Sequence, residues 1–209
     1  MNTAIYVGLA AIAYLLGSIP FGLILVRIAR GADVRLTGSG NIGATNVARI
    51  GGAKLGIATL MLDVLKGYLA VLSAVVASGQ YRGIDIGLAA AIAALCAILG
   101  HVFPIWLRFR GGKGVATAVG AFVGLAPRAV LVVLAIFLVI VLIFRYVSLG
   151  SIVASAIFPI FAFFLYRSES SPAALAVMLG ASLLIILKHK ANIRRLLDGT
   201  ENRLQFHKS

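Results

Sequence analysis

Acidic residues are scarce in this chain of 209 residues, where six Asp and Glu stand against 19 Lys and Arg. Cysteine is scarcer still, because Cys96 is the only one and lies in an apolar stretch. A disulfide framework and a Cys-based metal site are therefore excluded. The three histidines are widely spread and few carboxylates accompany them, so no cluster has the spacing of metal ligands. We expect a site with no metal and no cofactor.

Charged residues of both signs together make up only 12% of the chain, whereas 61% of its residues are apolar and the mean hydropathy is +1.06. Soluble domains carry about 25% charged residues. One small core cannot bury this much apolar surface, so we exclude a soluble globular protein and a disordered chain. The composition predicts an all-α polytopic membrane protein that forms a single domain over residues 1–209.

Seven apolar runs predict seven transmembrane helices. The runs cover residues 3–26, 53–77, 84–99, 114–126, 129–144, 149–165 and 173–187. A helix needs about 20 residues to cross roughly 30 Å of hydrocarbon, so the fourth run is short for a span. No positive residue precedes the first run and no small-residue cleavage site follows it, so we interpret this run as an uncleaved span.

The basic residues predict the orientation. With the N-terminus outside and the C-terminus in the cytosol, the inside segments carry fifteen Lys and Arg, and the outside loops carry three. Membrane proteins keep Lys and Arg in cytoplasmic loops, so the net charge of +13 does not require nucleic acid as a partner. If the fourth run failed to cross, the basic tail would lie outside, against this rule. The charge count therefore favours seven spans.

Polar side chains gather in a first inside segment, residues 35–49. Its small hydrogen-bonding residues are Ser39, Asn41, Thr45 and Asn46, and its arginines are Arg35 and Arg49. Gly38 and Gly40 allow backbone N–H groups to turn toward a bound anion. The segment is either an anion-binding loop or a flexible polar connector.

A second inside segment, residues 101–117, contains the turn Gly111-Gly112-Lys113-Gly114 at the start of the short fourth helix. A helix N-terminus presents unpaired N–H groups and a partial positive charge, which suit a phosphate. The turn is not a Walker A loop, because no Gly stands five residues before Gly112 and no Ser or Thr follows Lys113. The alternative is a positively charged interfacial loop.

A third inside segment, residues 188–201, closes the seventh span. Its His189 and Asn192 are three apart and so share one helical face. Taken alone, this segment also fits a lipid-headgroup anchor. Asp63 and Lys66 lie three apart within the second span, where charges normally pair or face a polar cavity. They are either a structural ion pair or a support for the site.

Two catalytic motifs are absent from the sequence. No His-x-x-x-x-Asp occurs, because His101 leads to Trp106 and His189 leads to Arg194, which weighs against the soluble type of acyltransferase. No Gly-x-Ser-x-Gly elbow occurs either, since Ser39 lies in Thr-Gly-Ser-Gly-Asn. We give His207, near the end of the chain, no role.

Together these segments resemble the bacterial acyl-phosphate:glycerol-3-phosphate acyltransferase family (PlsY). The resemblance rests on Gly-Ser-Gly-Asn-Ile-Gly-Ala-Thr-Asn at 38–46, His-x-Phe-Pro…Gly-Gly-Lys-Gly-Val-Ala-Thr at 101–117, Lys-His-x-x-Asn-Ile-x-Arg at 188–195, and Asp63-x-x-Lys66-Gly. It extends over nearly the whole chain, with the motifs in the expected order.

The resemblance implies a multi-pass enzyme of the bacterial inner membrane whose active site faces the cytosol. It would move a fatty acyl group from acyl phosphate to the 1-hydroxyl of glycerol 3-phosphate, the first step of phospholipid synthesis. Its partners would be these two substrates and membrane lipids. The expected catalytic residues are Ser39, Arg49, His189 and Asn192, with Asp63 and Glu201 as structural supports. The expected substrate-binding residues are Gly38, Gly40, Asn41, Thr45, Asn46, Lys54, Lys66, His101, Gly111, Gly112, Lys113, Gly114 and Thr117.

This chemistry needs positioning more than a reactive side chain. Acyl phosphate is already activated and phosphate leaves readily, so a covalent enzyme intermediate, ATP and a metal are unnecessary. Lys113, Arg49 and the amides of residues 111–114 would screen the two phosphates, and Ser39 and Asn46 would orient them. Either His189 or a substrate phosphate oxygen takes the hydroxyl proton.

The sequence gives less support to two other classes of function. A carrier for a phosphorylated solute is the main alternative, but its anion-binding groups would reach from both faces toward the midplane. Here the polar segments cluster on one predicted face. A non-catalytic membrane scaffold would not need two Gly-rich anion loops.

The orientation can be tested with single cysteines at positions 39, 113 and 189 in a Cys96→Ser background. We expect any reaction of these cysteines with a membrane-impermeant thiol reagent to come from the cytosolic side, because the basic residues favour that side for all three segments. Labelling of position 113 from the outside only would contradict this topology.

Overall fold

The computed structural model describes residues 2–204, and over that range the chain is helical without a β-strand. The chain forms two compact units, the first ending at Leu125 and the second beginning at Ala126. Each unit is described on its own, and the single domain over residues 1–209 stays a prediction. His207 and the basic residue Lys208 lie outside the described residues.

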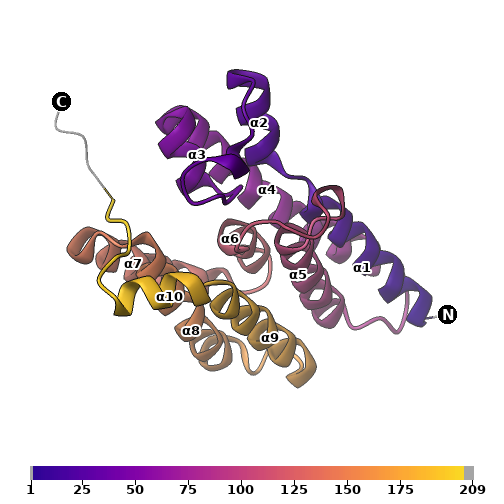
Figure 1. Ribbon diagram of the computed structural model, residues 1–209. Helices are drawn as coiled ribbons and strands as arrows, with labels where there is room; N and C mark the ends of the chain where they lie inside the picture. Colours follow the sequence, from indigo (N-terminus) through magenta and orange to yellow (C-terminus); the bar gives the residue numbers. More distant parts are fainter. Residues whose placement is uncertain (1, 205–209) are drawn as a thin grey trace. The chain divides into compact units, whose positions relative to one another are not determined.

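Over its described residues, unit 1 contains six α-helices and two short 3-10 turns; its helices are labelled in Figure 1. They are α1 (Asn2–Ser18), α2 (Phe21–Arg30), η1 (Val34–Leu36), α3 (Ala44–Gly51), α4 (Ala53–Ser78), α5 (Ile86–Val102), η2 (Ile105–Leu107) and α6 (Val115–Val123). Helix α1 packs on α4 and α5, and α4 also contacts α3 and α6. The predicted first span, 3–26, is corrected, because the helix breaks before Pro20 and then runs on to Arg30. Proline lacks the N–H that a continuous helix would need there.

Glycines let the helices of unit 1 approach at backbone distance. A Cβ on Gly120 of α6 would lie less than 3.0 Å from the carbonyl oxygen of Val64 in α4. A Cβ on Gly67 of α4 would crowd the backbone of Thr117 in α6 in the same way. Small residues at membrane helix interfaces matter because association in lipid depends on close packing, not on the hydrophobic effect.

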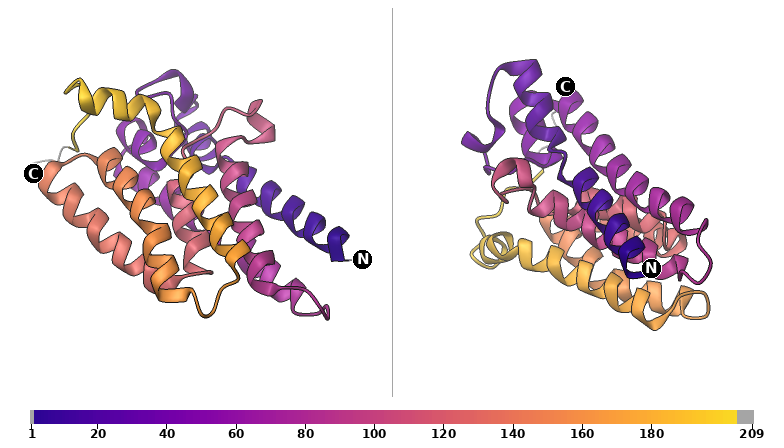
Figure 2. Two further views of the ribbon diagram at one scale, coloured as in Figure 1. Left: turned by 90° about the horizontal axis from the view of Figure 1, so that it is seen from below. Right: turned by 90° about the vertical axis from the view of Figure 1, so that its right-hand side faces the viewer.

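Up to residue 204, unit 2 contains four helices, α7 (Pro127–Phe144), α8 (Val147–Tyr166), α9 (Pro172–Lys188) and α10 (Lys190–Leu197). Helix α8 contacts α7 and α9, and α10 contacts both α8 and α9. Proline stands in the first turn of α7 and α9, where no N–H has an intrahelical acceptor. The chain bends by 53° between α9 and α10, and this bend is visible in Figure 2.

Each of the seven predicted apolar runs contains a helix, but these helices are not equally long. Among the described residues, five segments are long and apolar enough to cross a membrane, namely Thr3–Arg30, Ala53–Ser78, Ile86–Leu107, Pro127–Phe144 and Val147–Tyr166. The bent pair α9–α10 gives a sixth candidate. Helix α6 has nine residues, so it is about 14 Å long and covers roughly half of the hydrocarbon layer. The count of seven spans and the orientation stay predictions.

Gly120→Ala should lower the melting temperature of the detergent-solubilised protein, because the added methyl group would collide with the Val64 backbone. Overpacking of this kind costs about 1–3 kcal/mol. Gly8→Ala is the matched control, since a Cβ there has nothing within 4 Å. Equal melting temperatures for the two variants, followed by circular dichroism, would contradict the close packing of α4 on α6.

Candidate functional site

Two of the three predicted polar segments belong to unit 1, and the third belongs to unit 2. In unit 1 the serine loop (residues 37–43) joins η1 to α3, and the glycine loop (residues 111–114) leads into α6. In unit 2 the third segment forms the α9–α10 bend and the tail after α10. Within residues 2–204, no three His, Cys, Asp or Glu side chains gather as they would around a metal ion.

The side-chain amide of Asn46 holds the serine loop. Asn46 is 2% exposed, and its Oδ1 accepts a hydrogen bond from the N–H of Ser39 at 2.9 Å. Its Nδ2 donates to the carbonyl oxygens of Asn41 (2.9 Å), Val34 (3.1 Å) and Thr37 (3.2 Å). The sequence predicts Asn46 as a substrate-binding residue, but both polar atoms of its amide are engaged inside the protein. The side chain shapes the loop that carries Ser39.

Ser39 lies between two glycines in the left-handed region, Gly38 at φ 61° and Gly40 at φ 67°. A Cβ on Gly38 would lie less than 3.0 Å from Oδ1 of Asn46, so glycine is required for the amide to approach. The N–H of Gly40 donates to the carbonyl oxygen of Thr37 at 3.1 Å. The N–H groups of Ser39 and Gly40 thus donate hydrogen bonds within the protein. The polar group that this part of the loop exposes to a ligand is the Ser39 side chain.

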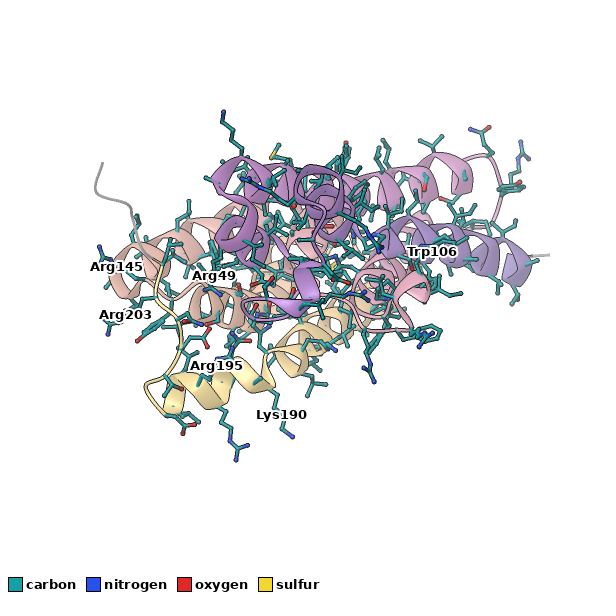
Figure 3. The ribbon with its side chains drawn as sticks, turned by 45° about the horizontal axis from the view of Figure 1, so that its top comes forward. Arg49, Trp106, Arg145, Lys190, Arg195 and Arg203 are labelled. Carbon is teal, nitrogen blue, oxygen red and sulfur yellow. The ribbon has the colours of Figure 1, made fainter. Side chains whose placement is uncertain are left out.

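Helix α3 follows the serine loop and presents two further exposed polar residues. Thr45 and Arg49 are four apart and therefore share one face of α3. Arg49 is labelled in Figure 3. Lys54 is exposed in the first turn of α4, which α3 contacts. Ser39, Thr45, Arg49 and Lys54 are the predicted residues of this part of unit 1 whose side chains are exposed.

Arg35, in contrast, is already paired. Its guanidinium lies 2.5 Å from the carboxylate of Asp33, which also accepts a hydrogen bond from the Arg35 backbone at 2.9 Å. The side-chain hydrogen bond from Arg35 is the main cause that lowers the pKa of Asp33 to about 2. Of the two arginines in the first segment, Arg49 is the better candidate for an anion.

The glycine loop folds back on the end of α5. The N–H of Gly111 donates to the carbonyl oxygen of Val102 at 3.1 Å, and the N–H of Gly112 donates to that of His101 at 3.0 Å. A Cβ on Gly112 would overlap Nε2 of the His101 ring. The expectation that these two N–H groups bind a phosphate is therefore corrected. Gly111 and Gly112 are needed for close approach to α5, because any side chain would push the loop away.

The first turn of α6 still has the features of an anion-binding site. The prediction that this helix begins at the glycine turn is confirmed. Gly114 caps the helix at φ 87° without a side-chain cap, and Lys113 immediately precedes it. Thr117 in this turn is fully buried, and among the described residues no hydrogen-bond partner lies near its Oγ1. The unpaired N–H groups at a helix start carry a partial positive charge. Anion-binding capacity therefore concentrates over residues 113–117.

The two charges in the second span form a buried ion pair. Nζ of Lys66 lies 2.8 Å from Oδ1 of Asp63 and donates to the carbonyl oxygen of Ile19 at 2.8 Å. Nδ1 of His101 lies 3.6 Å from the same Asp63 oxygen. All three side chains are at most 4% exposed. The structure thus shows the two charges paired, and the predicted substrate-binding residues Lys66 and His101 are both buried. A role of the pair in supporting the site stays a prediction.

In unit 2, Glu201 joins the tail to two helices. Its Oε1 accepts hydrogen bonds from Oγ of Ser148 (2.8 Å) and Nδ2 of Asn192 (2.7 Å), and its Oε2 accepts one from Nε of Arg195 (2.7 Å). Figure 3 labels Arg195 on α10. Partial burial alone would raise the pKa of Glu201, but these three hydrogen bonds and the charge of Arg195 lower it. Ser148 is the residue that sequence reasoning missed, because 53 positions separate it from Glu201.

His189 lies at the bend between α9 and α10 and is 2% exposed. Its Nδ1 lies 2.8 Å from the carbonyl oxygen of Ile185. A carbonyl can only accept, so Nδ1 carries the hydrogen and Nε2 of the neutral ring carries the lone pair. Asn192 follows on α10 and is 4% exposed. The arrangement gives unit 2 a histidine with one defined basic nitrogen.

Comparison with known proteins gives a consistent result. Residues 7–199 match the family model described as glycerol-3-phosphate acyltransferase. The glycerol-3-phosphate acyltransferase of Syntrophotalea carbinolica is 48% identical over 97% of this chain and 99% of its own. That of Geobacter sulfurreducens is 50% identical over 94% of this chain and 96% of its own.

Solved structures of PlsY (YgiH), an integral membrane glycerol 3-phosphate acyltransferase, are also similar. The glycerol 3-phosphate form has a TM-score of 0.84 and 40% identity, and covers 96% of both chains. The lysophosphatidic acid form has a TM-score of 0.82 and 38% identity, and covers 96% of this chain and 95% of its own.

Glu201→Gln should destabilise the protein in a pH-dependent way. The folded-state pKa of Glu201 is lowered from its ordinary value of 4.5, so the carboxylate stabilises the fold fully above about pH 4.5. That contribution is lost as the pH falls through the lowered pKa. The difference in melting temperature between wild type and variant should therefore be largest near neutral pH and shrink in acid.

The control for this experiment is Glu169→Gln. Glu169 is exposed and lies 3.8 Å from the exposed Arg128, and surface ion pairs of this kind contribute little. A melting-temperature difference for Glu201→Gln that stays constant into acid would contradict a stabilising carboxylate at this position.

Proposed function

The chain belongs to the glycerol-3-phosphate acyltransferase family, and from this premise we propose that it uses acyl phosphate as its donor. It transfers the fatty acyl group to the 1-hydroxyl of glycerol 3-phosphate and releases lysophosphatidic acid and phosphate. The similar solved structures, in glycerol 3-phosphate and lysophosphatidic acid forms, support this choice of acceptor and product. The enzyme serves phospholipid synthesis.

The observation that carries the choice of donor is the first turn of α6. A helix start without a side-chain cap, a preceding Lys113 and the buried hydroxyl of Thr117 together offer donors to one phosphate. This turn opens a nine-residue helix whose remaining residues are apolar. Such a site suits a molecule that carries a phosphate at one end and a long acyl chain at the other.

In the proposed reaction, the 1-hydroxyl oxygen attacks the carbonyl carbon of the acyl phosphate. The ester C–O bond forms, and the bond between that carbon and the phosphate oxygen breaks. Lys113 and the N–H groups at the start of α6 stabilise the charge that grows on the departing phosphate. Arg49 and Lys54, with the hydroxyl of Thr45, bind the phosphate of glycerol 3-phosphate, and Ser39 orients the reacting groups.

One proton must leave the attacking hydroxyl. His189 can accept it at Nε2, because its Nδ1 already donates to the Ile185 carbonyl. A phosphate oxygen of the substrate is the alternative acceptor. Asn192 and Glu201 keep the segment around His189 in place through their mutual hydrogen bond.

The remaining predicted residues act by positioning. Asn46, Gly38, Gly40 and Asn41 define the serine loop, and Gly111, Gly112 and His101 define the glycine loop, supported by Asp63 and Lys66. Holding two reactants in the attacking geometry can supply roughly 7–11 kcal/mol of the barrier. We propose that no acyl-enzyme and no metal take part, because the donor is already activated. The distribution of basic residues supports a site that faces the cytosol. The bacterial inner-membrane location follows from the family resemblance.

The direct test supplies the purified protein with glycerol 3-phosphate and palmitoyl phosphate. We expect release of phosphate with formation of lysophosphatidic acid, an unchanged rate in EDTA, and no acylated protein after incubation with palmitoyl phosphate alone. A folded protein that releases no phosphate would contradict the proposed donor, and trapped acyl-protein would contradict direct transfer.

His189→Ala tests the proton acceptor. If His189 is the base, kcat should fall by about 10²-fold or more. The control is Lys190→Ala, because Lys190 is the exposed neighbour at the start of α10. Near-normal kcat for a folded His189→Ala would assign the proton to the substrate phosphate.

A further inference from the structure

The segment just before the glycine loop exposes apolar and basic side chains on the protein surface. In this interface loop (residues 104–110), Ile105 is 47% exposed, Trp106 62% and Phe109 57%. Arg108 and Arg110 are exposed beside them. Trp106 is labelled in Figure 3. No acidic residue occurs anywhere in residues 86–168, so nothing nearby in the sequence compensates the two arginines.

The interface loop has a defined backbone. The N–H groups of Leu107 and Phe109 both donate to the carbonyl oxygen of Pro104, at 3.1 and 3.0 Å. The side chain of Leu107 points inward, where it belongs to a buried cluster with Val34 and Val47. One residue thus anchors the loop in the core of unit 1, and its neighbours are held facing outward.

Two consecutive residues of this loop adopt a conformation that side chains disfavour. Arg108 has φ 53° and Phe109 has φ 62°, both in the left-handed region. Glycine would occupy these positions without strain, yet the chain places a cation and an aromatic ring there. Such strain is typical of functional loops whose surroundings fix the backbone.

The position of the loop indicates what these side chains meet. It contains the last residues of the candidate span Ile86–Leu107, so Trp106 lies at the end of a membrane-crossing segment. Tryptophan is enriched at the boundary between hydrocarbon and headgroups, and arginine near a membrane surface attracts anionic lipid. A phosphate in the headgroup layer, with acyl chains beneath it, matches arginines beside exposed apolar side chains.

We propose that the interface loop is a binding site for anionic phospholipid headgroups. Arg108 and Arg110 bind the lipid phosphate, while Ile105, Trp106 and Phe109 insert among the upper acyl carbons. Because the loop leads directly into Gly111–Gly114, lipid binding holds the first turn of α6 at headgroup depth, where the phosphate of an acyl phosphate lies. This consequence for catalysis rests on the proposed function, whereas lipid binding does not.

Trp106 is the only tryptophan of the chain, so its fluorescence reports on this loop without any label. The protein is reconstituted into phosphatidylcholine vesicles that contain phosphatidylglycerol, with bromine on the upper acyl carbons of one lipid or the other. Both leaflets have the same composition, so the orientation of the protein does not matter. From the quenching we obtain the association constant of phosphatidylglycerol at the loop relative to that of phosphatidylcholine. We expect this ratio to exceed about five, because one arginine near a membrane surface favours anionic lipid by about that factor.

Arg108→Gln/Arg110→Gln should bring this ratio toward one, while bromine on phosphatidylcholine still quenches Trp106. Arg82→Gln/Arg167→Gln is the matched control, because it removes the same charge from exposed positions in other loops. Equal quenching by both lipids in the wild type, or equal effects of the two double variants, would overturn a specific anionic-lipid site. Absence of quenching by either lipid would place the loop outside the bilayer and overturn the insertion.

Phe109→Gly separates strain from function. Glycine accepts the positive φ, so the variant should keep or raise the melting temperature, but it should weaken quenching of Trp106 by both brominated lipids. A variant that is stabilised with unchanged quenching would show that Phe109 does not insert. These readouts need no turnover, so they stay valid if the palmitoyl phosphate assay fails.

Discussion

A buried ion pair within α4, one of the candidate membrane spans, connects the parts of unit 1. The ammonium of Lys66 and the carboxylate of Asp63 lie 2.8 Å apart and are almost inaccessible. Charges at this depth are costly unless they are paired, so neither residue can be accommodated without the other. The same ammonium binds the Ile19 carbonyl at the break of the first span, and the same carboxylate faces His101 at the end of α5. Three helical segments therefore meet at one polar contact.

Both loops that carry the candidate site pack against segments that take part in this contact. Three residues after Ile19, Gly22 packs so closely on the backbone of Ile42 that a Cβ would not fit, and Ile42 belongs to the serine loop. On the other side, the ring of His101 lies against Gly112 of the glycine loop. Glycine is required at both positions because a Cβ would collide with the backbone of Ile42 in one case and with the buried ring of His101 in the other. The polar core of the span and the position of the two loops are thus parts of one arrangement.

This arrangement favours catalysis by positioning. In both loops several backbone N–H groups are engaged within the protein, namely those of Ser39, Gly40, Gly43, Gly111 and Gly112, and these bonds shape the loops before any substrate binds. The groups left for substrates are side chains on short helices, such as Arg49 on α3, and the first turn of α6. In unit 2, Glu201 fixes the segment around His189 in a comparable way, through Ser148, Asn192 and Arg195. A preorganised site of this kind suits a donor that is already activated and an acceptor that needs only orientation and loss of a proton.

The membrane class, the helical runs, the three polar segments and the family could be predicted from the residues alone, because apolar length, charge distribution and motif spacing are properties of neighbouring residues. The sequence also allowed the Asp63–Lys66 pair, since residues three apart in a helix lie together. Three features could not be predicted in this way, because they depend on contacts made in the folded chain. They are the break before Pro20, the engagement of Asn46 and the packing of Gly111 and Gly112 on α5. Ser148 is the clearest case, because its partner Glu201 lies 53 positions away. A hydrogen-bond donor or a glycine in the sequence indicates that a residue can make a close contact. Which residue it contacts depends on which segment packs against it in the folded protein.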